Sequence, residues 1–437
     1  MSEVLSIEQT ISEQFQQWAG QHFADESPLK ALKAGALEQF STLGLPAPKS
    51  EAYKYTPISR ILGKQFNFAA ETTPASFSKA DCQSQFYQIA DANHLVFVNG
   101  LFNEEYSTIV SPSSDLTIRV LDDQALKEHS DIPQLLGKTS HIEADAFALL
   151  NLAFFNQGIY LKAAKNKDNK DTFIYHFIDG TAKDAIVYPR ILVSSETGSR
   201  LSIFEKTYIR GEQNTLNVSI FEADVQANAE LRYTKIQNYL TGTYAVEGIY
   251  ATQKKDSRFY TNTFSFKAAL IRNNIYINVD AENCEAHMNG LYQLGGKTHV
   301  DNNTSVDHLK PNCFSNELYK GILDENSRGV FNGKIYVRPE AQKTNAFQSN
   351  NNILLSDTAT VNTKPQLEIW ADDVKCSHGC TTGQLDEEAI FYLRSRGINK
   401  KRAKALMLNA FANETLQEVK NDLVTAEIED IITNKLG

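Results

Sequence analysis

Apolar positions along the chain predict helical ends and a long central stretch of short strands. Near the N-terminus they recur at helical spacing, which predicts amphipathic helices. The positions that carry this pattern are Ile11, Phe15, Trp18 and Ala19, followed by Leu29, Leu32, Ala36 and Phe40. Gly44, Pro46 and Pro48 then predict the end of the helical segment. A further short helix is predicted over residues 144–156, ending before Gly158.

From residue 159 to residue 370 the pattern changes to short alternating runs of apolar and polar residues, which predicts strands. The predicted strands cover residues 172–178, 190–193, 201–204, 217–221, 230–236, 275–279, 334–337 and 366–369. An earlier strand is predicted at residues 95–98, closed by the turn sequence Asn99-Gly100. Because almost no helix-length pattern interrupts the central strands, a doubly wound α/β sheet is excluded, while a sandwich, a barrel or a β-helix stays possible.

An approximate internal repeat favours the β-helix among these folds. Asp301-Asn302-Asn303 recurs as Ser349-Asn350-Asn351 after 48 positions, which we interpret as about two coils of a solenoid. Gly290-Leu291-Tyr292 and Gly321-Ile322-Leu323 give a weaker hint of the same kind. The repeat therefore predicts a β-solenoid core.

The end of the chain, from residue 386, has the pattern of helices. Asp386, Glu387 and Glu388 place negative charge at a helix start, where the helix dipole favours it, and Gly397 provides a stop. A second helix carries an apolar stripe at residues 403, 406, 407, 410 and 411, and a third follows over residues 416–432. Since so small a bundle has little core of its own, we expect it to pack on the β region or on a partner.

These patterns divide the chain into four regions. We expect an N-terminal helical region at residues 1–75, a mixed α/β connecting region at residues 76–158, a β-helix core at residues 159–383 and a C-terminal helical region at residues 384–437. A chain of 437 residues is long enough for more than one structural region, because a single core rarely grows beyond about 250 to 300 residues.

Composition and charge narrow the classes of function. The formal net charge of -10 argues against a general affinity for nucleic acid or for an anionic membrane. Residues 1–6 lack the basic start of a secretion signal, and no apolar run approaches the ~18 residues of a membrane span, which predicts a cytoplasmic protein. Five cysteines are too few for a disulfide framework in so long a chain, so a special cysteine is expected to be a thiol or a ligand.

Sequence signatures of several common enzyme classes are missing. The chain has no G-x-S-x-G elbow, no P-loop and no Rossmann fingerprint. Gly295-Gly296-Lys297-Thr298 lacks the first glycine and the helix of a phosphate-binding loop. We therefore expect a chain without turnover of its own, beside which another subunit would carry out any ATP hydrolysis.

The richest chemical pattern is Cys376-Ser377-His378-Gly379-Cys380. In a strand, side chains at i, i+2 and i+4 point the same way, so Cys376, His378 and Cys380 could share one face. Thiolate and neutral imidazole are ligands of iron, zinc and iron-sulfur species. The alternative is a structural role, because the spacing is no standard zinc motif, Gly379 could break the strand, and cysteine is commonly a small buried apolar residue.

Other residues that could carry chemistry are His299, Asp301, His308, Cys313, Cys284 and His287. Strand alternation places His299 and Asp301 on one face and His308 on the other, so no convergent metal site follows. We expect these groups to hydrogen-bond along stacked coils instead. Cys284 and His287 have helical spacing inside a strand region, which makes a shared site weaker still.

Residues 365–398 closely resemble the C-terminal signature of the SufB/SufD family of iron-sulfur cluster assembly proteins. The resemblance continues over residues 319–323, 328–337, 341–344 and 351–356, and near the N-terminus Glu51-Ala52-Tyr53-Lys54-Tyr55-Thr56 is similar to the family element Glu-x-Trp-Lys-Tyr-Thr. The run Val374-Lys375-Cys376-Ser377-His378-Gly379 looks like SufD, whereas the equivalent SufB run reads more like Val-Glu-His-Glu-Ala-Thr.

This resemblance implies a right-handed parallel β-helix between helical N- and C-terminal regions. It also implies a SufD-type scaffold that pairs with a SufB-like subunit through the β-helix and binds a SufC-like ATPase through its C-terminal helices. A transient iron-sulfur cluster would be assembled at the interface with the SufB-like subunit, and none is expected tightly bound to the isolated chain. His378 matches the family histidine implicated at that interface, and Cys376 matches its neighbouring cysteine.

Some alternatives stay open beside this reading. The family usually has alanine at the position of Cys380, so this thiol is either an extra ligand or a tolerated small residue, and we favour the second. The isolated chain is a possible homodimer. Competing functions are a secreted-type β-helix enzyme acting on an acidic polysaccharide, and a purely structural scaffold without metal ligation. The missing secretion signal and the two terminal helical regions argue against the enzyme.

Overall fold

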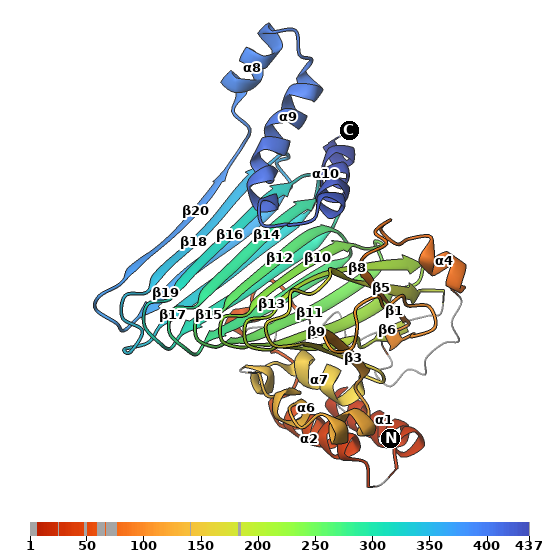
Figure 1. The fold of residues 1–437 in the computed structure, drawn as a ribbon. Coiled ribbons are helices and arrows are strands. Elements are labelled where there is room, and N and C mark those ends of the chain that lie inside the picture. The colour runs from red at the N-terminus through yellow and green to blue at the C-terminus, as the bar shows by residue number, and fades with distance from the viewer. Residues whose placement is uncertain are drawn as a thin grey trace, which may run out of the picture.

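The computed structural model describes residues 7–24, 26–47, 50–58, 66, 77–139, 141–181 and 185–436. Residues 1–6, on which the expected lack of a secretion signal depends, and the expected boundary after residue 75 lie outside these ranges. Within them the chain forms a β-solenoid with helices near both ends (Figure 1), which confirms the predicted fold class. The boundaries of the four expected regions stay predictions.

The helices lie before, between and after the strands. The first are α1 (Ile7–His22), α2 (Pro28–Leu43) and η1 (Glu51–Tyr53). Those between the first strands are α4 (Lys79–Gln83), α5 (Asp123–Glu128), α6 (Ile132–Leu135), η2 (Ile142–Ala144) and α7 (Ala146–Phe154). The C-terminal helices are α8 (Glu387–Ser395), α9 (Lys400–Asn413), η3 (Glu414–Leu416) and α10 (Asp422–Leu436). None of the helices described is long and apolar enough to cross a bilayer.

Two sheets form the walls of the solenoid. The first contains, in spatial order, β2 (Leu101–Phe102), β1 (Asn93–Val98), β5 (Thr172–Asp179), β8 (Arg200–Arg210), β10 (Glu230–Asn238), β12 (Arg258–Lys267), β14 (Glu285–Leu294), β16 (Phe314–Leu323), β18 (Asn345–Leu354) and β20 (Lys375–Gly383). The second contains β19 (Thr360–Ile369), β17 (Arg328–Val337), β15 (His299–His308), β13 (Leu270–Val279), β11 (Thr243–Gln253), β9 (Thr215–Val225), β7 (Arg190–Ser195), β4 (Ile159–Ala163) and β3 (Leu116–Val120), with β6 (Ala185–Val187) also paired to β9. From β7 onwards the chain alternates between the sheets, so two successive strands make one coil.

Successive coils stack residue upon residue. Leu270 pairs with His299, and His299 pairs with Arg328, so these coils repeat every 29 residues. The interpretation of 48 positions as two coils is therefore wrong. Asp301 lies in β15 and Ser349 lies in β18, and these strands belong to different sheets. The similarity of the two sequences therefore gives no measure of the coil length.

Apolar side chains fill the solenoid and also cover part of both outer faces. Inward residues of the two sheets, among them Ile203, Leu231 and Ile275, form a continuous core. Helices α1, α2 and α7 pack on the outer face of the second sheet, and α9 and α10 pack on the outer face of the first (Figure 1). The C-terminal helices thus meet the expectation that they pack on the β region.

Local sequence explains where the helices begin and end. The Ser27 side chain accepts a hydrogen bond from the backbone of Lys30 at the start of α2, and Gly44 ends that helix with a φ of 71°. At the start of α8 the Asp386 carboxylate accepts from the backbone N–H of Glu388 at 2.9 Å. Gly397 follows the helix with a φ of +87°. These ends agree with the predicted ones, although Pro48 lies outside the described residues.

Two tyrosines inside the solenoid interlock with glycines of the neighbouring coil. Gly290 of β14 pairs with Tyr319 of β16, and Tyr292 pairs with Gly321 two residues further along the same strands. A Cβ at Gly290 would lie 2.1 Å from the Tyr319 ring, and a Cβ at Gly321 would lie 2.5 Å from the Tyr292 ring. Both tyrosines are fully buried. The glycines are therefore required by the rings beside them, which explains the weaker repeat in the sequence.

Replacing Gly290 with alanine is expected to destabilise the protein by about 1–3 kcal/mol, because the added methyl group overlaps the Tyr319 ring. Urea unfolding followed by circular dichroism measures this change. Gly379→Ala is the matched control, since Gly379 lies in β20 of the same sheet and no atom lies within 4 Å of a Cβ built there. Equal unfolding midpoints for the two variants would contradict the interlocking.

Candidate functional site

Cys376, His378 and Cys380 lie in the last coil of the solenoid. β19 and β20 are the final strands of their sheets, and each pairs with a neighbouring strand of its sheet on one side. Within the described chain no strand is bonded to their other edges. Most of β20 is exposed, in contrast to the buried strands of the preceding coils. The solenoid therefore ends in an open coil with unpaired backbone groups.

Cys376, His378 and Cys380 lie on the same face of β20. In the register with β18 they stand beside Ala346, Gln348 and Asn350, and these three residues are buried. The shared face is therefore the one that continues the interior of the solenoid. Gly379 does not break the strand, since β20 continues to Gly383. The structure thus decides the question of local geometry that the sequence left open.

The three side chains differ in what lies behind them. Cys376 packs against an apolar cluster that includes Ile335 and Ala346, and burial raises the pKa of its thiol above the ordinary value. The neutral thiol is therefore favoured in the isolated chain, and a thiolate ligand would need a metal or a positive partner to stabilise it. Behind His378 stands Gln348, and behind Cys380 stands Asn350.

The described part of the chain holds no complete set of metal ligands. Across the described ranges, no group of three or more His, Cys, Asp and Glu side chains is arranged to hold a metal ion. Cys376 is half-buried, while Cys380 is exposed and His378 is exposed beside it. A metal or cluster at this position would need further ligands from outside the chain, because iron-sulfur clusters take four protein ligands as a rule.

The second group of candidate residues has structural partners. Arg272 Nη1 donates to Asp301 Oδ2 at 2.6 Å, and the Thr56 hydroxyl donates to the same oxygen. His299 Nε2 lies 3.1 Å from Thr56 Oγ1. Thr56 belongs to the N-terminal run that carries the family resemblance, so these contacts fasten that run to β15. They leave Asp301 as a buried structural anion paired with arginine.

The remaining candidates also hold the coils together. His308 faces the interior, opposite to His299, and its Nε2 lies 2.9 Å from Ser315 Oγ; burial lowers the pKa of His308 to about 4. The buried thiols of Cys284 and Cys313 lie 3.1 Å and 3.2 Å from main-chain carbonyl oxygens. His287 stacks on Tyr260 with the ring centres 4.5 Å apart. These residues are not brought to the open coil.

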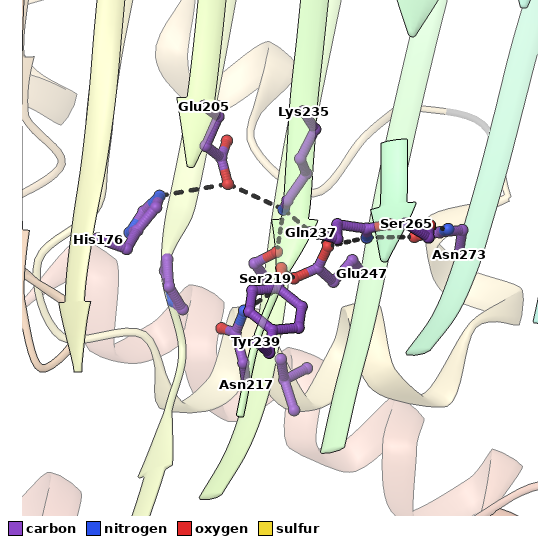
Figure 2. A network of polar contacts seen from close by, with 12 residues as sticks. His176, Glu205, Asn217, Ser219, Lys235, Gln237, Tyr239, Glu247, Ser265 and Asn273 are labelled. Carbon is purple, nitrogen blue, oxygen red and sulfur yellow. Dashed lines mark hydrogen bonds and ion pairs between the residues drawn. The ribbon is translucent and has the colours of Figure 1, made fainter. Parts of the chain in front are cut away.

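A network of charged side chains lies inside the solenoid (Figure 2). Lys235 Nζ lies 2.8 Å from Glu205 Oε1 and 3.0 Å from Glu247 Oε2, and the Lys235 and Glu side chains are at most 3% exposed. His176 Nε2 lies 3.2 Å from Glu205 Oε1 on the far side. From Glu247 the hydrogen bonds continue through Gln237. The network joins strands of both sheets across the interior.

Mutual attraction keeps Glu205 and Lys235 charged. Burial by itself would raise the pKa of Glu205, but Lys235 and His176 bring it below its ordinary range. Burial would lower the pKa of Lys235, and the two carboxylates raise it above the ordinary value. Sequence reasoning missed this network, although one signal was present. Lys235 occupies the same phase of its predicted strand as Leu231 and Tyr233, which is the inward phase.

Known proteins resemble this chain over nearly its whole length. A family model described as "SUF system FeS cluster assembly, SufBD core domain" matches residues 176–411, and one described as "SufBD protein N-terminal region" matches residues 6–172. The chain is 29% identical over 417 residues to "Iron-sulfur cluster assembly protein SufD" of Escherichia coli, with 94% of each chain covered. It is 30% identical over 406 residues to "Iron-sulfur cluster assembly SufBD family protein slr0076" of Synechocystis, covering 90% of this chain and 88% of that protein.

The charged interior predicts a strong effect of removing its cation. Lys235→Met is expected to destabilise the protein by about 3–5 kcal/mol at neutral pH, because two buried carboxylates lose their shared ammonium group. The pKa of Glu205 is depressed in the parent, so the parent keeps this stability above about pH 4.5 and loses it only below. The unpaired carboxylates of the variant instead take up protons more readily. The difference in stability should therefore shrink as the pH falls from 8 to 5.

Urea unfolding at several pH values measures this difference. Lys310→Met is the control, because Lys310 pairs with Glu340 at 2.9 Å on the exposed surface. Its unfolding midpoint should stay near that of the parent. A Lys235→Met protein with the parent's midpoint at pH 7 would show that the network contributes little to the fold.

Proposed function

Since the chain belongs to the SufBD family of SUF-system iron-sulfur cluster assembly proteins, we propose that it serves as a SufD-like scaffold subunit. In this proposal a cluster is built as cargo at the open coil and is then passed on. The observation that carries the proposal is the common face of Cys376 and His378, which offers sulfur and nitrogen ligands at an unpaired end of the solenoid. We do not include Cys380 among the required ligands.

The partner at the open coil is proposed to be a SufB-like subunit. Exposed edge strands present backbone donors and acceptors that favour pairing with another chain. β19 and β20 offer two such edges side by side, and a partner there would stand next to His378 and Cys376. It could therefore supply the remaining ligands of a shared, transient cluster. When no partner is present, the same edges would support a homodimer.

The chain is proposed to have no turnover of its own. Any ATP hydrolysis in this scheme belongs to a SufC-like ATPase, and the work takes place in the cytoplasm. The alternative of a polysaccharide-cleaving β-helix enzyme gains no support, because the family match is to cluster assembly proteins and helices cover part of each sheet face. A purely structural scaffold without metal ligation would be indicated if replacing His378 left cluster recovery unchanged.

The ATPase is proposed to dock on the C-terminal helices, mainly on α8. This helix stands away from the sheets, whereas α9 and α10 lie against the first sheet (Figure 1). On α8, Phe391 is 70% exposed and Tyr392 is 58% exposed. Neighbouring exposed aromatic side chains are typical of the central contacts of protein interfaces. On α9, Ala403, Leu408 and Ala412 are buried, whereas Leu406 of the predicted apolar stripe is 45% exposed.

His378→Ala is expected to lower cluster recovery about tenfold, because a ligand would be lost while the fold of an exposed strand is kept. The chain is coexpressed anaerobically with SufB-like and SufC-like subunits, and iron, sulfide and visible absorption of the purified complex are measured. Cys380→Ala is the control and should change recovery much less. Parental iron and sulfide in the His378→Ala complex would favour the purely structural scaffold.

Replacing both Phe391 and Tyr392 with serine is expected to weaken ATPase binding about 30-fold or more, as removal of two interface anchors does. Binding is measured by calorimetry with the purified ATPase. Leu423→Ser is the control, since Leu423 is 45% exposed on α10. Point substitutions are preferable to removing residues 384–437, which would uncover the apolar outer face of the first sheet. Unchanged binding would show that the ATPase docks on another surface.

A further inference from the structure

We propose that Gln348, held in place by Glu317, is a positioning residue that accepts a hydrogen bond from the His378 ring and thereby selects which ring nitrogen faces the open coil. The inference rests on the proposed function in one respect, namely that His378 is a ligand. The residues concerned lie on three neighbouring strands of the first sheet, β16, β18 and β20.

The three residues form one column through successive coils. Glu317 pairs with Gln348, and Gln348 pairs with His378. Strands paired in parallel lie about 4.8 Å apart, and residues in register point their side chains to the same side. The column runs from the buried interior to the open end, because Glu317 is 1% exposed and Gln348 is 3% exposed, while His378 is exposed.

The amide of Gln348 is held in one orientation. Its Nε2 donates to Glu317 Oε2 at 2.6 Å. Across the interior stands Gly333 of β17, where a Cβ would lie only 2.3 Å from the same nitrogen. The NH₂ group therefore occupies space that a larger residue would fill, and the accepting carboxyl oxygen of Glu317 fixes its direction. Rotation of the amide would lose the hydrogen bond and place a carbonyl oxygen beside a carboxyl oxygen.

This orientation leaves an unused acceptor on the residue that pairs with His378 in the strand register. Gln348 Oε1 is buried and has no hydrogen-bond partner among the described residues. A buried acceptor without a partner costs about 1–3 kcal/mol, so a nearby donor would be favoured. His378 is the next residue of the column, and its ring makes no hydrogen bond to the described chain. An imidazole N–H is the donor that this position can supply.

Glu317 has the properties of an anchor and not of a second ligand. Burial raises the pKa of its carboxyl to about 7, and the side chain lies two strands behind His378. Glu205 and Glu247 share the ammonium group of Lys235, whereas Glu317 accepts a hydrogen bond from the amide of Gln348. Holding that amide gives a structural reason for a carboxyl group at this depth.

The consequence for chemistry concerns the two nitrogens of the His378 ring. A neutral imidazole carries a hydrogen on one nitrogen and a lone pair on the other. If Gln348 accepts the N–H, the lone pair lies on the nitrogen turned away from the interior. That nitrogen faces the open coil, where a metal would be held. Partners of this kind orient metal-binding histidines in many sites, and losing them typically costs 10–100-fold in affinity or activity.

The test observes the ring of His378 directly in the full chain without partners. The protein is labelled with ¹⁵N-histidine, and His378→Ala identifies the resonances of this ring. In the parent, the two nitrogens should show one dominant tautomer. Gln348→Leu should move both toward the averaged shifts of a free imidazole. Glu317→Leu should do the same, since the Gln348 amide loses its anchor, whereas Glu317→Gln should keep the parental spectrum because its carbonyl oxygen still accepts from Nε2.

The outcomes separate this inference from the proposed function. Averaged nitrogen shifts in the parent, or parental shifts in Gln348→Leu, would overturn the positioning role whatever the cluster recovery. In the coexpressed complex, Gln348→Leu should lower cluster recovery about tenfold and Glu317→Gln should leave it near the parent. If His378→Ala had no effect on recovery while the tautomer responded as expected, the ligand assignment would fail and the hydrogen bond would stand.

Discussion

In-register stacking of parallel strands is the constraint on which this molecule depends. Each coil satisfies its backbone groups by bonding to the coils on either side, and a residue stands above its counterpart 29 positions away in the central coils. Side chains are therefore organised in columns along the solenoid. Residues of one column touch or support one another across coils, as do the glycine and tyrosine pairs of β14 and β16 and the residues Glu317 and Gln348 behind His378. The proposed site lies where such columns end, in the last coil.

Because the strands stack in register, the buried charges can favour one register over others. Lys235, Glu205 and Glu247 come from strands of both walls, so their contacts are made only when the coils stack in one register. An apolar interior alone would tolerate a slip of two residues, because alternation would be preserved. Charged groups would lose their partners in such a slip. The network thus favours one register at the cost of burying ions, as polar groups do in some other cores.

Alternation and turn residues were enough to predict the strands, the helix ends and the common face of Cys376, His378 and Cys380. These features depend on neighbours close in sequence. The coil length was not predicted, because the echo at residues 301 and 349 compares strands of opposite walls. Nor does the sequence alone point to Gln348 and Glu317, which belong to the proposed site. They lie about one and two coils before His378, and only the stacking register brings the three into line. The family resemblance points to His378 as a candidate but carries no information about what lies behind it.

The open coil has a further consequence for dynamics. In a solenoid each repeat is stabilised mainly by its nearest neighbours, so a terminal repeat with one neighbour opens more easily than a central one. β19 and β20 occupy that terminal repeat, and the residues of the proposed site are carried by its strands. Local unfolding should therefore begin in β19 and β20, which include the strand of the proposed site. A partner that pairs with these edges would supply the missing neighbour, so that assembly of the complex and rigidity of the site would become a single thermodynamic event.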